Sequence, residues 1–180
     1  QLGGFAIKNA VEKAGINPEE IDDVIMGCAM QQGTTGGNIA RLAALSGGLP
    51  YSVSGMSIDR QCSSGMMAIA TAAKQIIVDG MNTVIGGGLE SISLVQNKTM
   101  NTNRMIDEEL VKKHKSIYMP MLQTAEVVSE RYNISREKQD EYALQSQMKT
   151  AAAQESGKFQ NEIVPTTTEM AVYNKETGET

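Results

Sequence analysis

Two sequence periods alternate along the first half of the chain, and this alternation restricts the fold more than any other feature. Stretches with apolar residues at helical spacing and short apolar runs typical of buried strands follow one another. In order they are a helix at 2–14, a strand at 22–31, a loop and short helix within 34–50, a strand at 52–61, a helix at 62–80 and a strand at 82–91. This order predicts an α/β layer with a mainly parallel sheet.

The chain enters this pattern on a helix, whereas a parallel α/β unit normally begins with a strand that feeds its first helix. We therefore expect a strand before Gln1. From about Leu94 the sequence becomes polar and shows no strand pattern. We predict a first domain at 1–93 and a second domain at 94–180 on this change of character.

The second part of the chain is predicted to be mainly helical. One helix is expected around 121–132, where apolar residues recur at helical spacing. Another is expected at 135–157, with Ser135 as its N-cap and Gly157 as the residue that ends it. A short strand is predicted at 161–170.

Charge and composition exclude several classes of function. The formal net charge of -5 and the pI near 5.0 give no basic footprint for nucleic acid. No apolar run approaches the roughly 18 residues of a membrane span, and no signal peptide opens the chain, although a targeting segment before Gln1 is compatible with it. The two cysteines lack CxxC spacing and no histidine cluster stands near them, so we predict reduced thiols and no metal site.

Cys62 stands directly before two serines and a glycine at a predicted corner between strand and helix. The free N–H groups of a helix start favour a thiolate over a thiol. That effect is worth only about 0.3–1 kcal/mol, so a cysteine here needs a nearby base as well to be an efficient nucleophile. From spacing alone an inert buried cysteine is an equally good interpretation of Cys62. Cys28, inside an apolar strand pattern, is interpreted as a core residue.

Two further features are weaker indications of a functional site. His114 lies in the polar stretch "LVKKHKS" and is interpreted as a solvated surface residue rather than a catalytic base. The glycines at 86–88 fit neither of the common phosphate-loop patterns, and Glu90 follows where such a loop has a helix start or a lysine. We interpret these glycines as positions where the backbone is crowded near a site.

Three motifs, taken in order, resemble the N-terminal half of a thiolase, an acetyl-CoA or 3-ketoacyl-CoA acyltransferase. "DRQCSSGMMAI" at 59–69 is similar to the nucleophile motif of that family. "VIGGGLESIS" at 84–93 is similar to its next strand and turn, and "MLQTAEVVSERYNISREKQDEYALQSQ" at 121–147 to its Met-Gly-x-Thr-Ala-Glu segment and following helix. The resemblance covers Leu2 to about Pro165.

The resemblance implies a thiolase-like layered α/β fold, in which 1–93 belongs to the N-terminal core and 94–180 to a helical loop domain that covers coenzyme A. Cys62 is then the nucleophile that takes the acyl group from acyl-CoA, and its backbone N–H helps to hold the thioester oxyanion. Coenzyme A thioesters are the implied substrates, and no cofactor is implied. The residues implied to lie along the pantetheine and acyl channel are Met119, Met121, Leu122 and Thr124.

The chain departs from the family pattern at several positions. Asp59 replaces the usual Asn of the nucleophile motif, Leu122 replaces a Gly, and Pro120 stands where biosynthetic members often have His. The pairs Arg60-Gln61 and Pro120-Met121 are more similar to members that act on longer chains, so the acyl length stays open. The family's Gly-His-Pro base motif, second Cys-x-Gly site and Asn-containing oxyanion motif are not in these residues, and they are expected in a C-terminal half.

The resemblance implies an acyltransferase with an acyl-cysteine intermediate. It cleaves a 3-ketoacyl-CoA with coenzyme A, or it condenses two acetyl-CoA molecules by Claisen chemistry. The alternatives are a thiolase-like protein that binds lipid or acyl-CoA without catalysis, and an oligomerisation scaffold without activity. Family members are typically homodimers or homotetramers with the strand before the nucleophile at the dimer contact, and we expect the cytoplasm, or the mitochondrion or peroxisome of a eukaryote, as the compartment.

Overall fold

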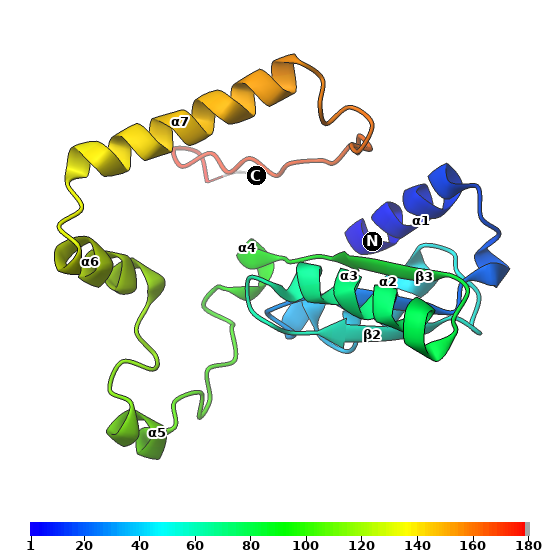
Figure 1. Cartoon of the computed structure of the whole chain (residues 1–180), viewed down its shortest axis with the longest axis horizontal. Helices are drawn as coiled ribbons and strands as arrows, with labels where there is room; N and C mark the ends of the chain where they lie inside the picture. The colour runs from blue at the N-terminus through cyan, green and yellow to red at the C-terminus, as the bar shows by residue number, and fades with distance from the viewer. Residues whose placement is uncertain (179–180) are drawn as a thin grey trace. The chain divides into compact units, whose positions relative to one another are not determined.

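The computed structural model describes residues 1–178 and divides the chain into two units, Gln1–Asn103 and Arg104–Thr180 (Figure 1). The first unit extends beyond residue 93, because Val95 is buried and the Asn101 N–H donates to Gln32 Oε1 at 2.8 Å. Each unit is described by itself below.

The first unit has the alternating order of helices and strands that the sequence predicts. Its elements are α1 (Leu2–Ala14), the 3-10 helix η1 (Pro18–Glu20), β1 (Asp23–Gly27), the 3-10 helix η2 (Gly33–Thr35), α2 (Ile39–Ser46), β2 (Ser54–Ile58), α3 (Ser64–Lys74), the π-helix η3 (Gln75–Asp79), β3 (Val84–Gly88) and α4 (Ile92–Val95). The predicted left-handed residue after the first helix is Gly15, with φ of 66°. A glycine adopts this conformation without the clash of a Cβ atom, so it ends α1 there.

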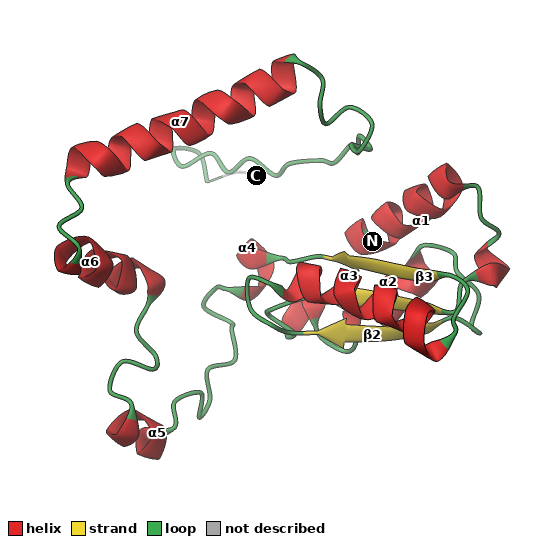
Figure 2. Ribbon diagram, viewed as in Figure 1, coloured by secondary structure: helices red, strands yellow, loops and turns green. Residues whose placement is uncertain are grey.

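The three strands form one parallel sheet in the order β2-β1-β3 (Figure 2). The predicted parallel sheet is therefore confirmed. The central strand β1 is buried along its whole length, which agrees with its continuous apolar sequence. In its register Asp23 pairs with Ser54 on one side and with Val84 on the other, so the three strands end at the same edge.

Helices cover both faces of this sheet. Alternate side chains of β1 point to opposite faces, so Val24 and Met26 pack with α1 and α2, whereas Ile25 packs with α3. The α3 residues that pack with Ile25 are Ala68 and Ala72, and their small side chains let the helix approach the sheet closely. The unit is thus a three-layer arrangement of helix, sheet and helix.

Glycines in the third strand allow that approach. A Cβ atom at Gly86 would lie 3.0 Å from Ile69 Cα and 3.1 Å from Ala72 Cβ, both on α3. At Gly88 it would lie 3.0 Å from the Gly27 carbonyl oxygen and 3.4 Å from Gly65 Cα. The interpretation of the glycine run as a crowded backbone is confirmed at these two positions.

The second unit contains α5 (Glu108–Lys113), α6 (Met121–Arg131) and α7 (Arg136–Glu155). The last two confirm the predicted helices, including the Ser135 side chain that accepts the Lys138 N–H, and Gly157 with φ of 69° beyond the end of α7. Helix α5 was not predicted from the sequence, and its N-cap Asp107 accepts the N–H groups of Glu109 and Leu110.

The predicted strand at 161–170 is wrong, because this run has no regular structure. A strand needs a neighbour to pair with its N–H and C=O groups, and the described part of the second unit holds no other strand. Pro165 also lacks the N–H that a ladder uses. Along residues 1–178, no helix is both long and apolar enough to cross a membrane.

Candidate active site

The carboxyl ends of the three strands meet at one edge of the sheet, and Cys62 lies there. In open parallel sheets this is the edge where ligands bind, because the loops that follow the strands diverge there. Cys62 follows β2 and stands two residues before the start of α3. Its side chain is exposed and carries a free thiol. The structure therefore favours an accessible cysteine over the alternative of an inert buried one.

The turn that carries Cys62 is held by its own side chains. Gln61 has a positive φ of 49°, which is uncommon for a residue other than glycine. The Gln61 N–H donates to Asp59 Oδ1 at 2.8 Å, which stabilises this turn. Because Asn carries the same oxygen at the same position, the departure to Asp59 retains the acceptor that the turn uses.

Hydrogen bonds of two serines connect the same turn to the start of α3. Ser63 and Ser64 donate their backbone N–H groups to the carbonyls of Arg60 and Gln61, each at 3.1 Å. The Ser64 hydroxyl donates to the Gln61 carbonyl at 2.6 Å and accepts the Arg60 N–H at 2.9 Å. The predicted strand-to-helix corner is confirmed, and its first N–H groups are occupied by the turn itself.

Gly27 lets α3 begin directly over the end of β1. A Cβ atom there would lie 2.3 Å from the Ser64 carbonyl carbon and 2.5 Å from the Gly65 nitrogen. No side chain fits in that space. The absence of a side chain at Gly27 therefore determines the distance between the start of α3 and the edge of the sheet. Cys62 lies just before that start.

Cys62 lines an open cavity of about 500 Å³ in the first unit. Its wall combines apolar and polar groups from the ends of all three strands and from α4. The lining residues besides Cys62 that bear side chains with a functional group or a large apolar surface are Met30, Gln61, Ser64, Leu89, Glu90, Ile92 and Gln96. The thiol thus shares one cavity with amide and carboxylate side chains.

Glu90 belongs to the thiolase-like motif at 84–93 and argues against a phosphate loop, and the structure places it in the wall of the Cys62 cavity. Its two carboxylate oxygens accept the N–H of Ala29 at 2.8 Å and the N–H of Met30 at 3.2 Å. The sequence signals for Glu90 are its position just after the glycine-rich third strand and its place in the thiolase-like motif at 84–93, and neither indicates its contacts with Ala29 and Met30.

Cys28 is one residue beyond β1, with 1% of its surface exposed, which confirms its interpretation as a buried residue. Its sulfur lies 3.5 Å from Glu90 Oε1 and 3.7 Å from the Met30 carbonyl oxygen. Burial raises the pKa of the Cys28 thiol, and the Glu90 carboxylate raises it further, against the opposing hydrogen bond of Thr35. Cys28 therefore stays a protonated thiol at neutral pH.

We expect iodoacetamide to alkylate Cys62 at least about tenfold faster than Cys28 in the folded protein near neutral pH, because reaction requires an accessible thiolate. The raised pKa of Cys28 means that its thiolate fraction increases only at more alkaline pH, so the difference persists through the neutral range. Mass spectrometry of the two cysteine peptides over time gives both rates. If Cys62 and Cys28 are alkylated at equal rates under native conditions, and if changes in salt or temperature do not make the two rates differ, this assignment is wrong.

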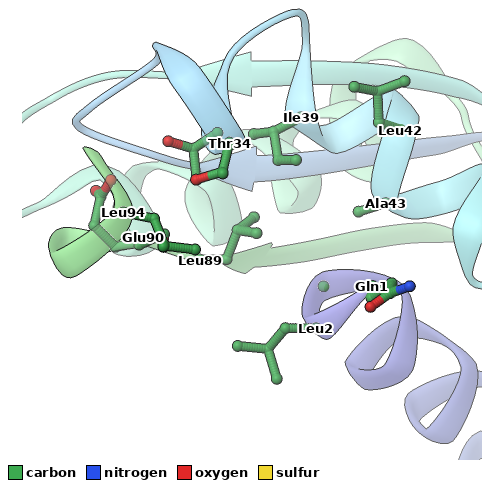
Figure 3. A pocket seen from close by; sticks show the side chains of 12 residues that line it. Gln1, Leu2, Thr34, Ile39, Leu42, Ala43, Leu89, Glu90 and Leu94 are labelled. Atoms are coloured by element: carbon green, nitrogen blue, oxygen red, sulfur yellow. The ribbon is translucent and has the colours of Figure 1, made fainter. Parts of the chain in front are cut away.

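A second cavity, of about 410 Å³, shares the lining residues Leu89 and Glu90 with the first. Figure 3 shows its largely apolar wall, with Leu2 from α1 and Leu42 and Ala43 from α2. Thr34 and Thr35 add polar groups from η2. Leu89 and Glu90 thus contribute to the walls of both cavities.

Comparison with known proteins agrees with this geometry. A family model described as the thiolase N-terminal domain matches residues 1–179. The chain belongs to the thiolase family. It is 40% identical over 164 residues to a 3-ketoacyl-CoA thiolase of Bacillus subtilis, covering 91% of this chain and 41% of that protein. It is 39% identical over 175 residues to an acetyl-CoA acetyltransferase of Cupriavidus necator, covering 92% and 44%.

A solved structure supports the same fold. The crystal structure of the Bacillus anthracis acetyl-CoA acetyltransferase matches with a TM-score of 0.74 and 38% sequence identity, over 92% of this chain and 44% of that one. The predicted α/β thiolase-like fold is therefore confirmed. The chain spans less than half the length of these relatives.

The other residues implied by the thiolase resemblance lie in the second unit. Met119 precedes α6, and Met121, Leu122 and Thr124 are in its first turn. Met121 and Leu122 are exposed, and Thr124 donates its N–H and its hydroxyl to the Pro120 carbonyl at 3.0 and 3.2 Å. They and Cys62 belong to different units, so the site above is built from the first unit alone. The role of these four residues stays a prediction.

His114 also lies in the second unit, at the C-terminal end of α5. Its side chain is exposed, as its charged sequence context predicts, and its backbone N–H donates to the Leu110 carbonyl at 2.8 Å. Among residues 1–178, no group of three or more His, Cys, Asp or Glu side chains lies together in the manner of a metal site.

Proposed function

We propose that this thiolase chain supplies the nucleophile of an acyl-CoA acyltransferase. The observation that carries the proposal is the exposed free thiol of Cys62 at the carboxyl edge of a parallel sheet, facing an open cavity. The family membership and the names of the relatives support the same chemistry. Coenzyme A thioesters are then substrates, and the proposed reaction uses no resident cofactor.

In the degradative direction the Cys62 thiolate attacks the keto carbonyl carbon of a 3-ketoacyl-CoA. A carbon–sulfur bond forms, the bond between that carbon and its neighbour breaks, and the electron pair passes to the neighbour, which takes a proton to leave as acetyl-CoA. The thiol of a second coenzyme A then attacks the acyl group on Cys62, and the enzyme thiol is released with a proton. In the synthetic direction Cys62 takes the acetyl group of acetyl-CoA, and coenzyme A leaves as its thiol. A base then removes an α-proton from a second acetyl-CoA, and the resulting carbanion attacks the acetyl group. Acetoacetyl-CoA forms, and the bond to Cys62 breaks to release the Cys62 thiolate.

The condensation with a second acetyl-CoA needs a base and a group that stabilises the enolate, in addition to the thiol. The one histidine, His114, lies in a charged exposed segment of the second unit. We therefore propose that residues 1–180 capture an acyl group but do not complete the condensation by themselves, and that the thiolase base motifs supply the remaining steps.

The region that begins α6 is proposed to contact the substrate. Met119, Met121, Leu122 and Thr124 are proposed to lie along the pantetheine and acyl chain, with the exposed Met121 and Leu122 as the apolar contacts. Flexible thioether side chains adapt to chains of different length. The acyl length and the physiological direction are left open between the two kinds of relative.

We further propose a homodimer or homotetramer with β2 at the dimer contact. The strand β2 is at an edge of the sheet, so one side of its backbone has no partner strand within the described chain. Met56 on this strand is 38% exposed and adds apolar surface to that edge. A reducing compartment, the cytoplasm or the mitochondrion or peroxisome of a eukaryote, suits a nucleophile that must remain a free thiol.

Incubation with acetyl-CoA tests the proposed nucleophile. We expect an acetyl group on the Cys62 peptide, with coenzyme A released in equal amount, because an exposed thiol with some thiolate attacks a thioester readily. Quenching in acid, proteolysis and mass spectrometry locate the label. Prior alkylation with iodoacetamide should abolish it.

Two results would oppose the proposal. Saturable binding of acetyl-CoA and acetoacetyl-CoA without any covalent label would favour the catalytically inactive acyl-CoA-binding alternative. Acetylation confined to another residue would remove Cys62 from the mechanism. Formation of acetoacetyl-CoA by residues 1–180 alone, at a rate within tenfold of a complete thiolase, would show that these residues already contain the base.

A further inference from the structure

The segment between β1 and η2 forms one wall of the Cys62 cavity. Ala29 and Met30 of this segment line the cavity directly. The segment is neither helix nor strand, so it has no ladder to satisfy its backbone groups. Its shape therefore depends on hydrogen bonds to side chains, from within the segment and from outside it.

Glu90 supplies those bonds on the N–H side. Oε2 accepts the Ala29 N–H at 2.8 Å, and Oε1 accepts the Met30 N–H at 3.2 Å. Two successive N–H groups that converge on one anion form a concave anion-binding arrangement. Hydrogen bonds to an ionised acceptor are roughly twice as strong as neutral ones. The carboxylate thus joins the end of β3 to the loop after β1, about 60 positions away in the sequence.

The carbonyl side of the same segment is held by uncharged groups. The Thr35 hydroxyl, which is buried, lies 2.5 Å from the Met30 carbonyl oxygen, and Gln31 Nε2 donates to the Cys28 carbonyl at 3.2 Å. Three side chains, those of Glu90, Thr35 and Gln31, form hydrogen bonds to this segment. Among them, Glu90 also lines the Cys62 cavity. A change at Glu90 therefore alters the wall and its support together.

Cys28 is enclosed by the same contacts. Its thiol lies against Glu90 Oε1 and the Met30 carbonyl, and 1% of the residue is exposed. If Glu90 no longer holds Ala29 and Met30, the cover over Cys28 loosens as well. The buried thiol is consequently a built-in reporter of the state of this wall.

We propose that Glu90 is a positioning residue for the Cys62 site, which fixes the 28–30 wall of the nucleophile cavity by holding the N–H groups of Ala29 and Met30. As a role in acyl capture this rests on the proposed function. Each Glu90 oxygen already accepts a backbone N–H, so we assign it no proton transfer. It acts through the wall, by keeping the acyl-CoA carbonyl aligned with the thiol.

The first test measures the rate of Cys62 acetylation against acetyl-CoA concentration in the intact protein. We expect Glu90→Ala to lower the maximum rate by about 10- to 100-fold, since a displacement of about 1 Å costs up to 100-fold, and to leave the half-saturating concentration within about threefold. Glu90→Gln retains one acceptor oxygen and should lose less, about 3- to 10-fold. The matched control is Ser91→Ala, because the Ser91 side chain makes no capping hydrogen bond; it should stay within about twofold of the parent.

An unchanged maximum rate in a folded Glu90→Ala protein would overturn the proposal. So would an equal loss in Ser91→Ala. If Glu90→Ala does not fold, Glu90→Gln decides by the same criteria. If Glu90→Ala lowers the unfolding midpoint but leaves the maximum rate of Cys62 acetylation in the folded fraction unchanged, the role of Glu90 is purely structural. That result would also overturn the proposal.

The second test does not depend on acyl chemistry and uses iodoacetamide on Cys28. We expect Cys28 to be alkylated at least about tenfold faster in Glu90→Ala than in the parent and in Ser91→Ala, because access and thiolate fraction both rise. If the parent protein is not acetylated at Cys62, the proposed function fails while this readout still decides whether Glu90 holds the wall. If Cys28 stays protected in both Glu90 variants, the positioning role is refuted.

Discussion

Replacing Cys62 by Ser should remove acyl capture almost completely while the fold remains. At neutral pH even an ordinary cysteine is a few per cent thiolate, whereas a serine hydroxyl without a strong base forms almost no alkoxide. We expect the rate of acetylation from acetyl-CoA to fall by more than about a thousandfold, in the range seen when other enzymes lose their nucleophile. Time-resolved mass spectrometry of the peptide that contains residue 62 measures this rate.

The structure argues that this substitution is mild for stability. Cys62 is exposed, and the turn around it is held by Asp59, Ser63 and Ser64 rather than by the thiol. Surface substitutions of this kind change the free energy of unfolding by about 0.5 kcal/mol or less. Near-parental acetylation of the Cys62→Ser protein would rule out covalent catalysis through this position, and Cys28→Ser serves as the matched variant that should keep the label.

The sequence predicted the first unit well because its signals are local. Apolar runs of strand length alternate with helical spacing, and a glycine follows the first helix where a left-handed residue is needed. The corner at Cys62 was predictable for the same reason, since a strand pattern, small residues and a helical pattern follow one another within about 20 residues. The thiolase motifs then assigned a chemistry to the thiol.

The prediction of α3 shows the limit of such patterns. Its apolar spacing identified a helix, but the side that packs on the sheet consists of Ser64, Ala68 and Ala72. The larger residues Met66 and Ile69 are exposed in this chain, at 74% and 59%. The period of the apolar residues does not show which side of the helix faces the sheet, because that choice depends on glycines in neighbouring strands, such as Gly86 beside Ile69 and Ala72.

Glu90 could not be assigned from sequence for a related reason. Its partners Ala29 and Met30 are backbone N–H groups, which every residue except proline carries, so no residue type signals the contact. The pairing appears only when the parallel register brings the ends of β1 and β3 to one edge. The failed strand at 161–170 is the converse case, in which a local pattern had no neighbour to pair with.

The close approach at Gly27 gives the second large expected effect. In Gly27→Ala the new Cβ would lie 2.3 Å from the Ser64 carbonyl carbon and 2.4 Å from its oxygen, so backbone must move. Overpacking of this kind costs typically about 1–3 kcal/mol, and we expect a loss of at least about 2 kcal/mol in the free energy of unfolding because no flexible side chain can yield. Denaturant unfolding measures this loss.

The same substitution should also impair the site, because the start of α3 and the Cys62 turn are tied together by Ser63 and Ser64. A shift of about 1 Å at the thiol lowers its reaction rate by up to about 100-fold, so acetylation of Cys62 in the folded fraction should fall by at least about tenfold. Gly65→Ala is the matched control for stability, since a Cβ there meets nothing within 4 Å and α3 gains a better helix former. If Gly27→Ala were as stable as Gly65→Ala and reacted at the parental rate, the contact between Gly27 and Ser64 would not be what sets the position of the nucleophile.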